Sequence, residues 1–121
     1  MSKMSRDKGA RYERKISGYI AEKLGIMARR HRGGFSGDDI EHSLQAFVSY
    51  ECKDQAATSL GSWLDQCVSN AGDRIAVVIH HRRGNGDPAK DFATLPLSDL
   101  CRLLDRAYLA DRDDADVRGI S

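Results

Sequence analysis

The sequence predicts an α/β domain in which a mixed β-sheet is flanked by helices. Two segments carry apolar residues at the 3–4 spacing of an amphipathic helix, and short segments rich in β-forming residues lie between and after them. An uninterrupted apolar run, Ile75–Ile79, has the length of a strand covered on both faces. In order, the elements are a helix, three strands, a helix, two strands and a helix. We expect one domain over residues 1–110 and a polar, frayed tail over 111–121.

The first half of the chain is predicted to form one helix and three strands. The helix runs from about Arg6 to Leu24, because its apolar stripe ends where Gly25 can stop a helix. That stripe consists of Ile16, Tyr19, Ile20 and Leu24. The strands lie near 26–31, 39–42 and 47–53, with a glycine-rich loop over 32–37.

The second half is predicted to form a helix, two strands and a last helix. Thr58 or Ser59 offers an N-cap for the first of these helices, and Gly72 closes it. The central strand 75–79 is followed by a turn over 83–88 and a short strand near 92–95. Ser98 is expected to cap the last helix. The apolar positions of the two helices are Leu60, Trp63, Leu64, Cys67, Val68 and Ala71, then Leu100, Leu103, Leu104 and Tyr108.

The charges are distributed unevenly along the chain. The net charge is only +1, yet residues 1–32 contain ten Lys and Arg against three Asp and Glu. Such a basic segment favours a phosphate-bearing partner, although a solvated helix face is the alternative interpretation. Helical angles place Arg11, Arg14 and Lys15 on the side opposite the apolar stripe. The candidate DNA contacts are Lys8, Arg11, Arg14, Lys15, Arg30 and Arg32.

Composition also limits the class of protein. No run approaches the ~18 apolar residues of a membrane helix, and the N-terminus lacks the apolar core of a signal peptide. We therefore expect a cytoplasmic protein with no membrane contact. The three cysteines, Cys52, Cys67 and Cys101, form no CxxC pair, so we expect reduced and mostly buried thiols rather than a disulfide framework or zinc site.

Acidic residues on two neighbouring strands suggest a metal site. Side chains alternate along a strand, so Glu51 and Lys53 share a face, as do Asp39 and Glu41. If the two strands pair as a hairpin, a carboxylate from each can converge. Such oxygen ligands suit Mg²⁺ or Mn²⁺, and Lys53 could position or deprotonate an attacking water. The alternative is an ordinary surface pair of Glu51 and Lys53.

Glu13 lies within the apolar stripe of the first helix. Burial of an isolated carboxylate is costly, so Glu13 should meet a cation, a metal ion or a hydrogen-bond donor. A metal site is one explanation. An ion pair with Arg29 or Arg30 is the other.

Four stretches in this order resemble the PD-(D/E)xK nuclease superfamily, most closely the small Holliday junction resolvases of archaea and some phages. The resemblance covers roughly residues 6 to 82 and continues through the helix around Trp63 into the strand 75–79. It implies a restriction-endonuclease-like fold with a mixed central β-sheet. The stretches are Lys8–Arg14, Arg32–Gly37, Asp38–Ile40 and Glu51–Lys53.

The resemblance also implies roles for individual residues. Three carboxylates would bind a divalent metal, Lys53 would assist hydrolysis, and Ser36 would lie near the cleaved phosphate. The usual proline is replaced by Asp38, which therefore competes for the ligand role. Asp39 is preferred because Ile40 follows it directly. Gln66 matches a glutamine in the corresponding helix of some related nucleases, with a solvent-facing position as the alternative. The metal ligands are Glu13, Asp39 and Glu51.

The function expected from these features is Mg²⁺-dependent cleavage of branched DNA at four-way junctions, with Mn²⁺ able to substitute. Two symmetric cuts would need two active sites, which a homodimer supplies. Another DNA nuclease of the same fold is the first alternative, since the motif does not encode substrate geometry. A DNA-binding module without catalysis is the second.

Overall fold

The chain forms an α/β structure whose order of elements agrees with the prediction. The computed structural model describes the backbone of residues 3–31 and 38–117, and the side chains of these residues except those of 5 and 110–117. A short 3₁₀ helix, η1, precedes the last strand. The elements are α1 (Lys3–Leu24), β1 (Ala28–Arg30), β2 (Ile40–His42), β3 (Val48–Lys53), α2 (Leu60–Ala71), β4 (Ile75–His80), η1 (Pro88–Lys90), β5 (Phe92–Thr94) and α3 (Leu97–Val117).

The strands are divided between two small sheets, whereas one mixed sheet was expected. β1 and β2 pair antiparallel, with Arg29 opposite Glu41. In the second sheet β4 is central, parallel to β3 and antiparallel to β5. β2 and β3 are not paired in one sheet, so the hairpin considered above is not formed; residues 43–47 connect them through a turn with local backbone bonds such as Val48 N–H to the Leu44 carbonyl. The sheets meet instead at Asp39, whose N–H donates to the Tyr50 carbonyl at 3.0 Å.

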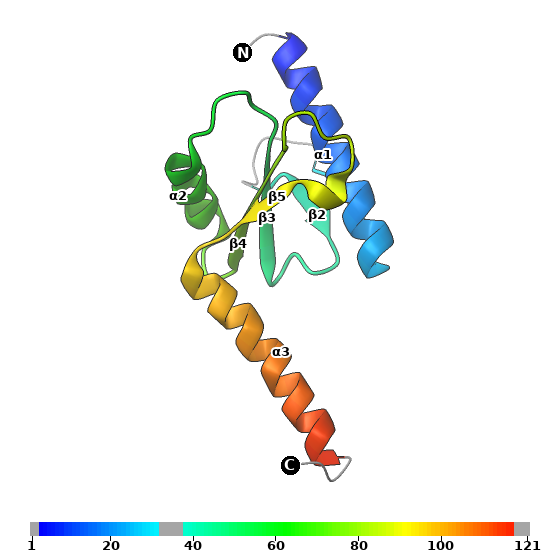
Figure 1. The fold of residues 1–121 in the computed structure, drawn as a ribbon, viewed down its shortest axis with the longest axis vertical. Coiled ribbons are helices and arrows are strands. Elements are labelled where there is room, and N and C mark those ends of the chain that lie inside the picture. Colours follow the sequence, from blue (N-terminus) through cyan, green and yellow to red (C-terminus); the bar gives the residue numbers. More distant parts are fainter. Residues whose placement is uncertain (1–2, 32–37, 118–121) are drawn as a thin grey trace.

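Two helices cover opposite faces of the strands β3 and β4 (Figure 1). On one side, α2 packs Trp63 and Cys67 against Ala76 and Val78 of β4. On the other side, α1 forms a second cluster with the sheets. Burial on both faces confirms the prediction that residues 75–79 form a central strand, and each large aliphatic side chain buried there contributes about 1.5–3 kcal/mol. The buried residues of the second cluster are Tyr12, Ile16, Ile20 and Ile40.

The ends of the first two helices are close to those predicted. Gly25 and Gly72 follow α1 and α2 with positive φ angles of 64° and 62°, which glycine adopts without strain. Ser59 occupies the N-cap position of α2, but its side chain makes no capping hydrogen bond. α1 begins at Lys3, before the predicted Arg6. Leu24 and Val68 were assigned to buried stripes and are exposed, because they lie at the margins of the packed helix faces.

The last helix differs most from expectation. It begins at Leu97, one residue before the predicted cap Ser98, and continues to Val117, so the segment expected to fray from Asp111 is helical as far as Val117. Figure 1 shows α3 extending away from the rest of the molecule. Its leucines are exposed, and so is Cys101, which contradicts the expectation of mostly buried thiols; Cys67 is buried, Cys52 half-buried, and all three are free.

Over the described part of the chain, no helix combines the length and the apolar character required to cross a membrane.

Candidate active site

One open pocket of about 780 Å³ brings together the four residues predicted to carry chemistry. They come from parts of the chain far apart in sequence: Glu13 from α1, Asp39 from the residue preceding β2, and Glu51 and Lys53 from β3. The convergence does not need the predicted hairpin, because α1 and the start of β2 both pack beside β3. Further lining residues are Arg6, Lys8, Arg30, Asp54, Gln55 and Gln66.

Glu51 is the most deeply placed acid of this pocket. β3 holds it opposite Val78 of the central strand. Its Oε1 lies 3.2 Å from Nζ of Lys53, and no described residue donates a hydrogen bond to its buried Oε2. Burial raises the pKa of Glu51, the Lys53 hydrogen bond and charge oppose this, and the charge of Asp39 adds to it. One oxygen of this carboxylate is therefore buried without a hydrogen-bond partner among the described residues.

Asp39 and Asp38 are adjacent in sequence but occupy different surroundings. Asp39 lines the pocket, and its Oδ2 accepts the Cys52 N–H at 2.8 Å. Burial raises the pKa of Asp39, although the Cys52 hydrogen bond opposes the shift. Asp38 is buried beneath the sheet in an ion pair with Arg74. The structure thus places Asp39 rather than Asp38 beside Glu51.

Asp38 is held by several donors at once. Burial acts to raise its pKa, but hydrogen bonds from Arg74, Ser49 and Gln45 outweigh it and hold the pKa of Asp38 below its usual value. Arg74 donates both Nη atoms to Asp38 and also reaches the Gln45 and Asn70 carbonyls. This network fixes the turn that leads into β3, and sequence reasoning missed it.

Glu13 faces the pocket from α1 and is paired with Arg30, one of the two partners considered above. Nε of Arg30 lies 3.4 Å from Oε2 of Glu13, but it makes no hydrogen bond within the described residues. Burial and then the charge of Asp39 raise the pKa of Glu13 to about 7, against the opposing charges of Arg30 and Arg14. Its ionised form is therefore less favourable here than it is in water.

The donor set fits a hard divalent cation in its chemistry. Three carboxylates have raised pKa values chiefly because they are withdrawn from water, with the charge of Asp39 adding to the shifts of Glu13 and Glu51, and a cation would stabilise their ionised forms. Among the described residues, no three acidic, histidine or cysteine side chains are already gathered at metal-binding distance. Glu13 and Glu51 instead face Arg30 and Lys53. Sharing one ion would require these side chains to turn.

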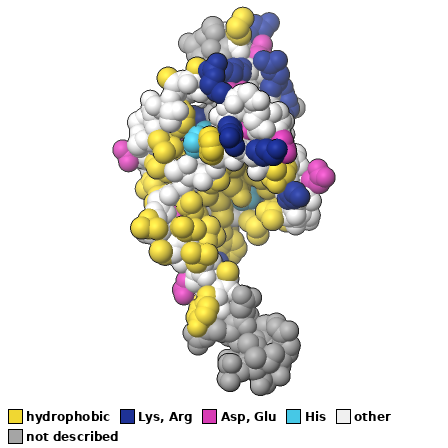
Figure 2. Space-filling model, viewed as in Figure 1, with side chains coloured by type: hydrophobic (Ala, Val, Ile, Leu, Met, Phe, Trp, Pro, Cys, Tyr) yellow, Lys and Arg dark blue, Asp and Glu magenta, His cyan; other side chains and the backbone are white. Residues whose placement is uncertain are grey.

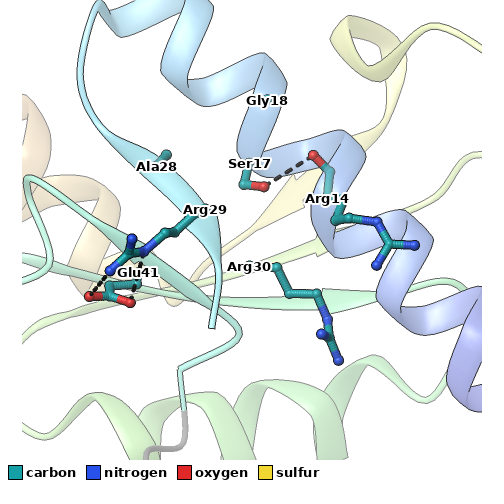
Figure 3. A pocket seen from close by; sticks show the side chains of 7 residues that line it. All are labelled: Arg14, Ser17, Gly18, Ala28, Arg29, Arg30 and Glu41. Atoms are coloured by element: carbon teal, nitrogen blue, oxygen red, sulfur yellow. Dashed lines mark hydrogen bonds and ion pairs between the residues drawn. The ribbon is translucent and has the colours of Figure 1, made fainter. Parts of the chain in front are cut away.

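Glu41 does not join the pocket, although alternation placed it on the same strand face as Asp39. It forms a two-pronged pair with Arg29, at 3.2 Å for each bond, on the rim of a neighbouring groove of about 750 Å³ (Figure 3). Arg29 lowers the pKa of Glu41 through hydrogen bonding and charge. Figure 3 shows Arg29 turned to Glu41 and Arg30 extending in another direction. Arg30 lines both the groove and the pocket.

Most of the basic residues predicted on α1 lie on the side of the helix away from Glu13. Arg11, Arg14 and Lys15 are exposed, as their helical angles predicted, and Arg14 lines the groove beside Arg30. Lys8 lines the pocket and lies 3.6 Å from Asp54. The predicted contacts Arg32 and Ser36 lie outside the described residues.

Sequence reasoning also missed a second polar cluster next to Glu13. The hydroxyl of Tyr12 donates to Asp91 at 2.8 Å, and Asp91 also accepts the Arg82 N–H. These bonds tie the loop after β4 to α1. Asp54 and Gln55, which line the pocket, were also missed. Their position directly after the ExK strand was the available signal, since strand ends often carry site residues. Gln66 is an exposed residue at the pocket wall.

Comparisons with protein-family models, with curated proteins and with solved structures find no match to this chain. The resemblance to PD-(D/E)xK nucleases therefore rests on the motif residues and on the pocket in which four of them lie.

Proposed function

We propose that this protein is a divalent-metal-dependent DNA endonuclease. One observation carries the proposal: Glu13, Asp39 and the Glu51–Lys53 pair, predicted as a set from sequence order, line a single pocket. An ordinary surface pair of Glu51 and Lys53 would not require two partly buried carboxylates from other elements beside it. Their raised pKa values mark the kind of site where acids are held close together for function.

Each residue of the pocket has a role in this proposal. Glu13, Asp39 and Glu51 would hold Mg²⁺ or Mn²⁺, which supplies a Lewis acid and lowers the pKa of a bound water. Lys53, only partly exposed and 3.2 Å from Glu51, would orient the attacking water and offset negative charge developing on the phosphorus. Arg30 and Lys8 would bind phosphate at the pocket wall.

Branched DNA is the proposed substrate. The basic residues of α1 support a nucleic-acid partner, because exposed cations neutralise phosphates and release counterions, and Arg6 and Lys8 of this helix line the pocket itself. Selectivity for four-way junctions is supported by the resemblance to the resolvases. Two symmetric cuts also favour a homodimer.

The test is a cleavage assay on a four-way junction and a linear duplex of the same sequence, with Mg²⁺, Mn²⁺ or EDTA. Cleavage of the junction should require the metal and exceed that of the duplex. Asp39→Asn and Glu51→Gln should abolish it, because each removes a charged ligand with little change in volume. Glu41→Gln is the matched control, since Glu41 lies on the neighbouring strand and outside the pocket.

Three outcomes would change the proposal. Equal cleavage of duplex and junction would indicate a nuclease of another substrate class. Tight binding without cleavage under any metal would indicate a DNA-binding module. Normal turnover by the Glu51→Gln variant would remove this pocket from the chemistry.

A further inference from the structure

The helix α3 is amphipathic, but its polar side faces the molecule. Asp99 accepts the N–H of Ala76 at 3.0 Å, and Arg102 donates to the Asp73 carbonyl at 2.7 Å. The guanidinium of Arg106 lies 4.7 Å from the ring centroid of Phe47. At ~100° per residue these three positions lie on one side of the helix. The contact with the body is thus made largely by charged side chains.

The opposite side of α3 is apolar and exposed. Leu97, Cys101, Leu104 and Tyr108 fall within an arc of about 60° on that side. Leu97 is 75% exposed, Leu104 57% and Tyr108 59%. Figure 1 shows this helix extending from the body, and Figure 2 shows hydrophobic side chains gathered on the molecule near its base. We name the stripe Leu97, Cys101, Leu104 and Tyr108 the outer face of α3.

We infer that the outer face of α3 binds the same face of a second copy of this chain, forming a homodimer. The inference does not depend on the proposed nuclease activity. It assigns to a particular helix the dimer contact that the sequence left unplaced.

The spacing and charge of the outer face suit such a partner. Its positions follow the alternating four- and three-residue steps of a seam between two packed helices, and an identical stripe on a second copy is complementary to it. The stripe contains no charged residue, so it offers nothing to DNA phosphates. Asp105 lies beside the stripe, whereas Arg102 is on the inward side of the helix, so the seam relies on apolar contact.

The area of the outer face is also sufficient. The four side chains of the outer face, together with Leu100 beside them, present apolar surface on the order of 400 Å². Since the core of an interface is about two-thirds apolar, this corresponds to about 600 Å² per copy, or about 1,200 Å² in total. That total is at the lower end of the range for stable complexes, so the dimer should dissociate at low protein concentration.

Sedimentation equilibrium of the full chain tests the inference. The wild-type protein should change from 13.4 kDa to twice that mass between ~1 and ~100 µM, and the dimer should persist in ~1 M NaCl because apolar contacts are not screened by salt. Leu104→Glu should remain monomeric at all these concentrations. Leu24→Glu is the matched control, since Leu24 is 53% exposed at the end of another helix and should leave the dimer intact.

Circular dichroism should show unchanged helix content in both variants. If Leu104→Glu does not fold, Cys101→Glu introduces a charge into the same stripe at an exposed, smaller residue and should likewise prevent dimer formation. A monomeric wild type at 100 µM would overturn the inference. So would a dimer that survives the folded variants of the outer face, or one that dissociates equally in Leu24→Glu.

Discussion

Replacing Glu13 with glutamine should make the protein more stable at alkaline pH and less active. The folded state raises the pKa of Glu13 from 4.5 to about 7, mainly through burial and then through Asp39. An acid with a raised pKa binds its proton more tightly in the folded state. Its stability contribution is therefore neutral below pH 4.5, where both states are protonated, and becomes unfavourable as the pH rises toward 7.

The size of this effect follows from the shift. A pKa raised from 4.5 to about 7 costs about 3 kcal/mol at pH 8 and less than about 1 kcal/mol at pH 5. Glu13 is 19% exposed, and solvent screening reduces the larger figure to about 2 kcal/mol. The attraction of Arg30 is already contained in the shift. Glu13→Gln should thus raise the melting temperature by about 8 °C at pH 8 and by little at pH 5.

Thermal melts without metal at pH 5, 6, 7 and 8 measure this difference. Glu41→Gln is the control, because Arg29 lowers the pKa of Glu41 and its substitution should bring no gain at alkaline pH. Cleavage by Glu13→Gln should fall, with partial recovery at high Mn²⁺ if Glu13 only supports the metal. A variant that melts below the wild type at pH 8 while cleaving normally would show that Glu13 serves the Arg30 ion pair and not the chemistry.

Three further predictions concern the pocket and its surroundings. Lys53→Ala should lose most cleavage but still bind Mn²⁺ with similar affinity by calorimetry, and loss of both would instead give Lys53 a structural role. Asp38→Asn should lower the free energy of unfolding by about 2–4 kcal/mol in urea melts, because it removes the charge that Arg74 pairs with beneath the sheet; an unchanged midpoint would contradict this. Reversing the charge of the exposed basic residues of α1 should weaken binding to junction and duplex alike and flatten the salt dependence of affinity. Unchanged affinity would identify them as a solvated face. These residues are Arg11, Arg14 and Lys15.

The sequence predicted elements whose signal is local. The stop of α1 at Gly25 and the burial of the central strand depend on a few adjacent residues, and both agree with the structure. Glu13, Asp39, Glu51 and Lys53 were predicted to lie together, and they line one pocket. Their order along the chain restricts which helix and strands must meet. Asp39 was preferred to Asp38 as a ligand because of the apolar residue that follows it; in the structure Asp39 lines the pocket and Asp38 forms an ion pair with Arg74.

Other features depend on partners that periodicity does not encode. β2 pairs with β1 and not with β3, and hydrophobic alternation is the same for either pairing, so the sequence pattern does not distinguish them. The leucines of α3 were predicted as an apolar helix face, but the pattern does not tell whether the chain itself covers that face. In α3 the chain does not cover it: Asp99 accepts the N–H of Ala76, which turns the polar side of the helix toward the body of the molecule.

The position of Asp39 between the two sheets has an evolutionary consequence. Its carboxylate accepts the Cys52 N–H and its own N–H reaches the Tyr50 carbonyl, so an apolar residue at 39 would leave a half-buried donor unpaired at a cost of about 1–3 kcal/mol. Selection for folding would thus retain an aspartate or asparagine at 39 even in a descendant that lacked the proposed nuclease activity. Oε2 of Glu51 accepts no hydrogen bond from any described residue. Among relatives of this chain, the residue at 51 would therefore be the better indicator of which ones share the proposed activity.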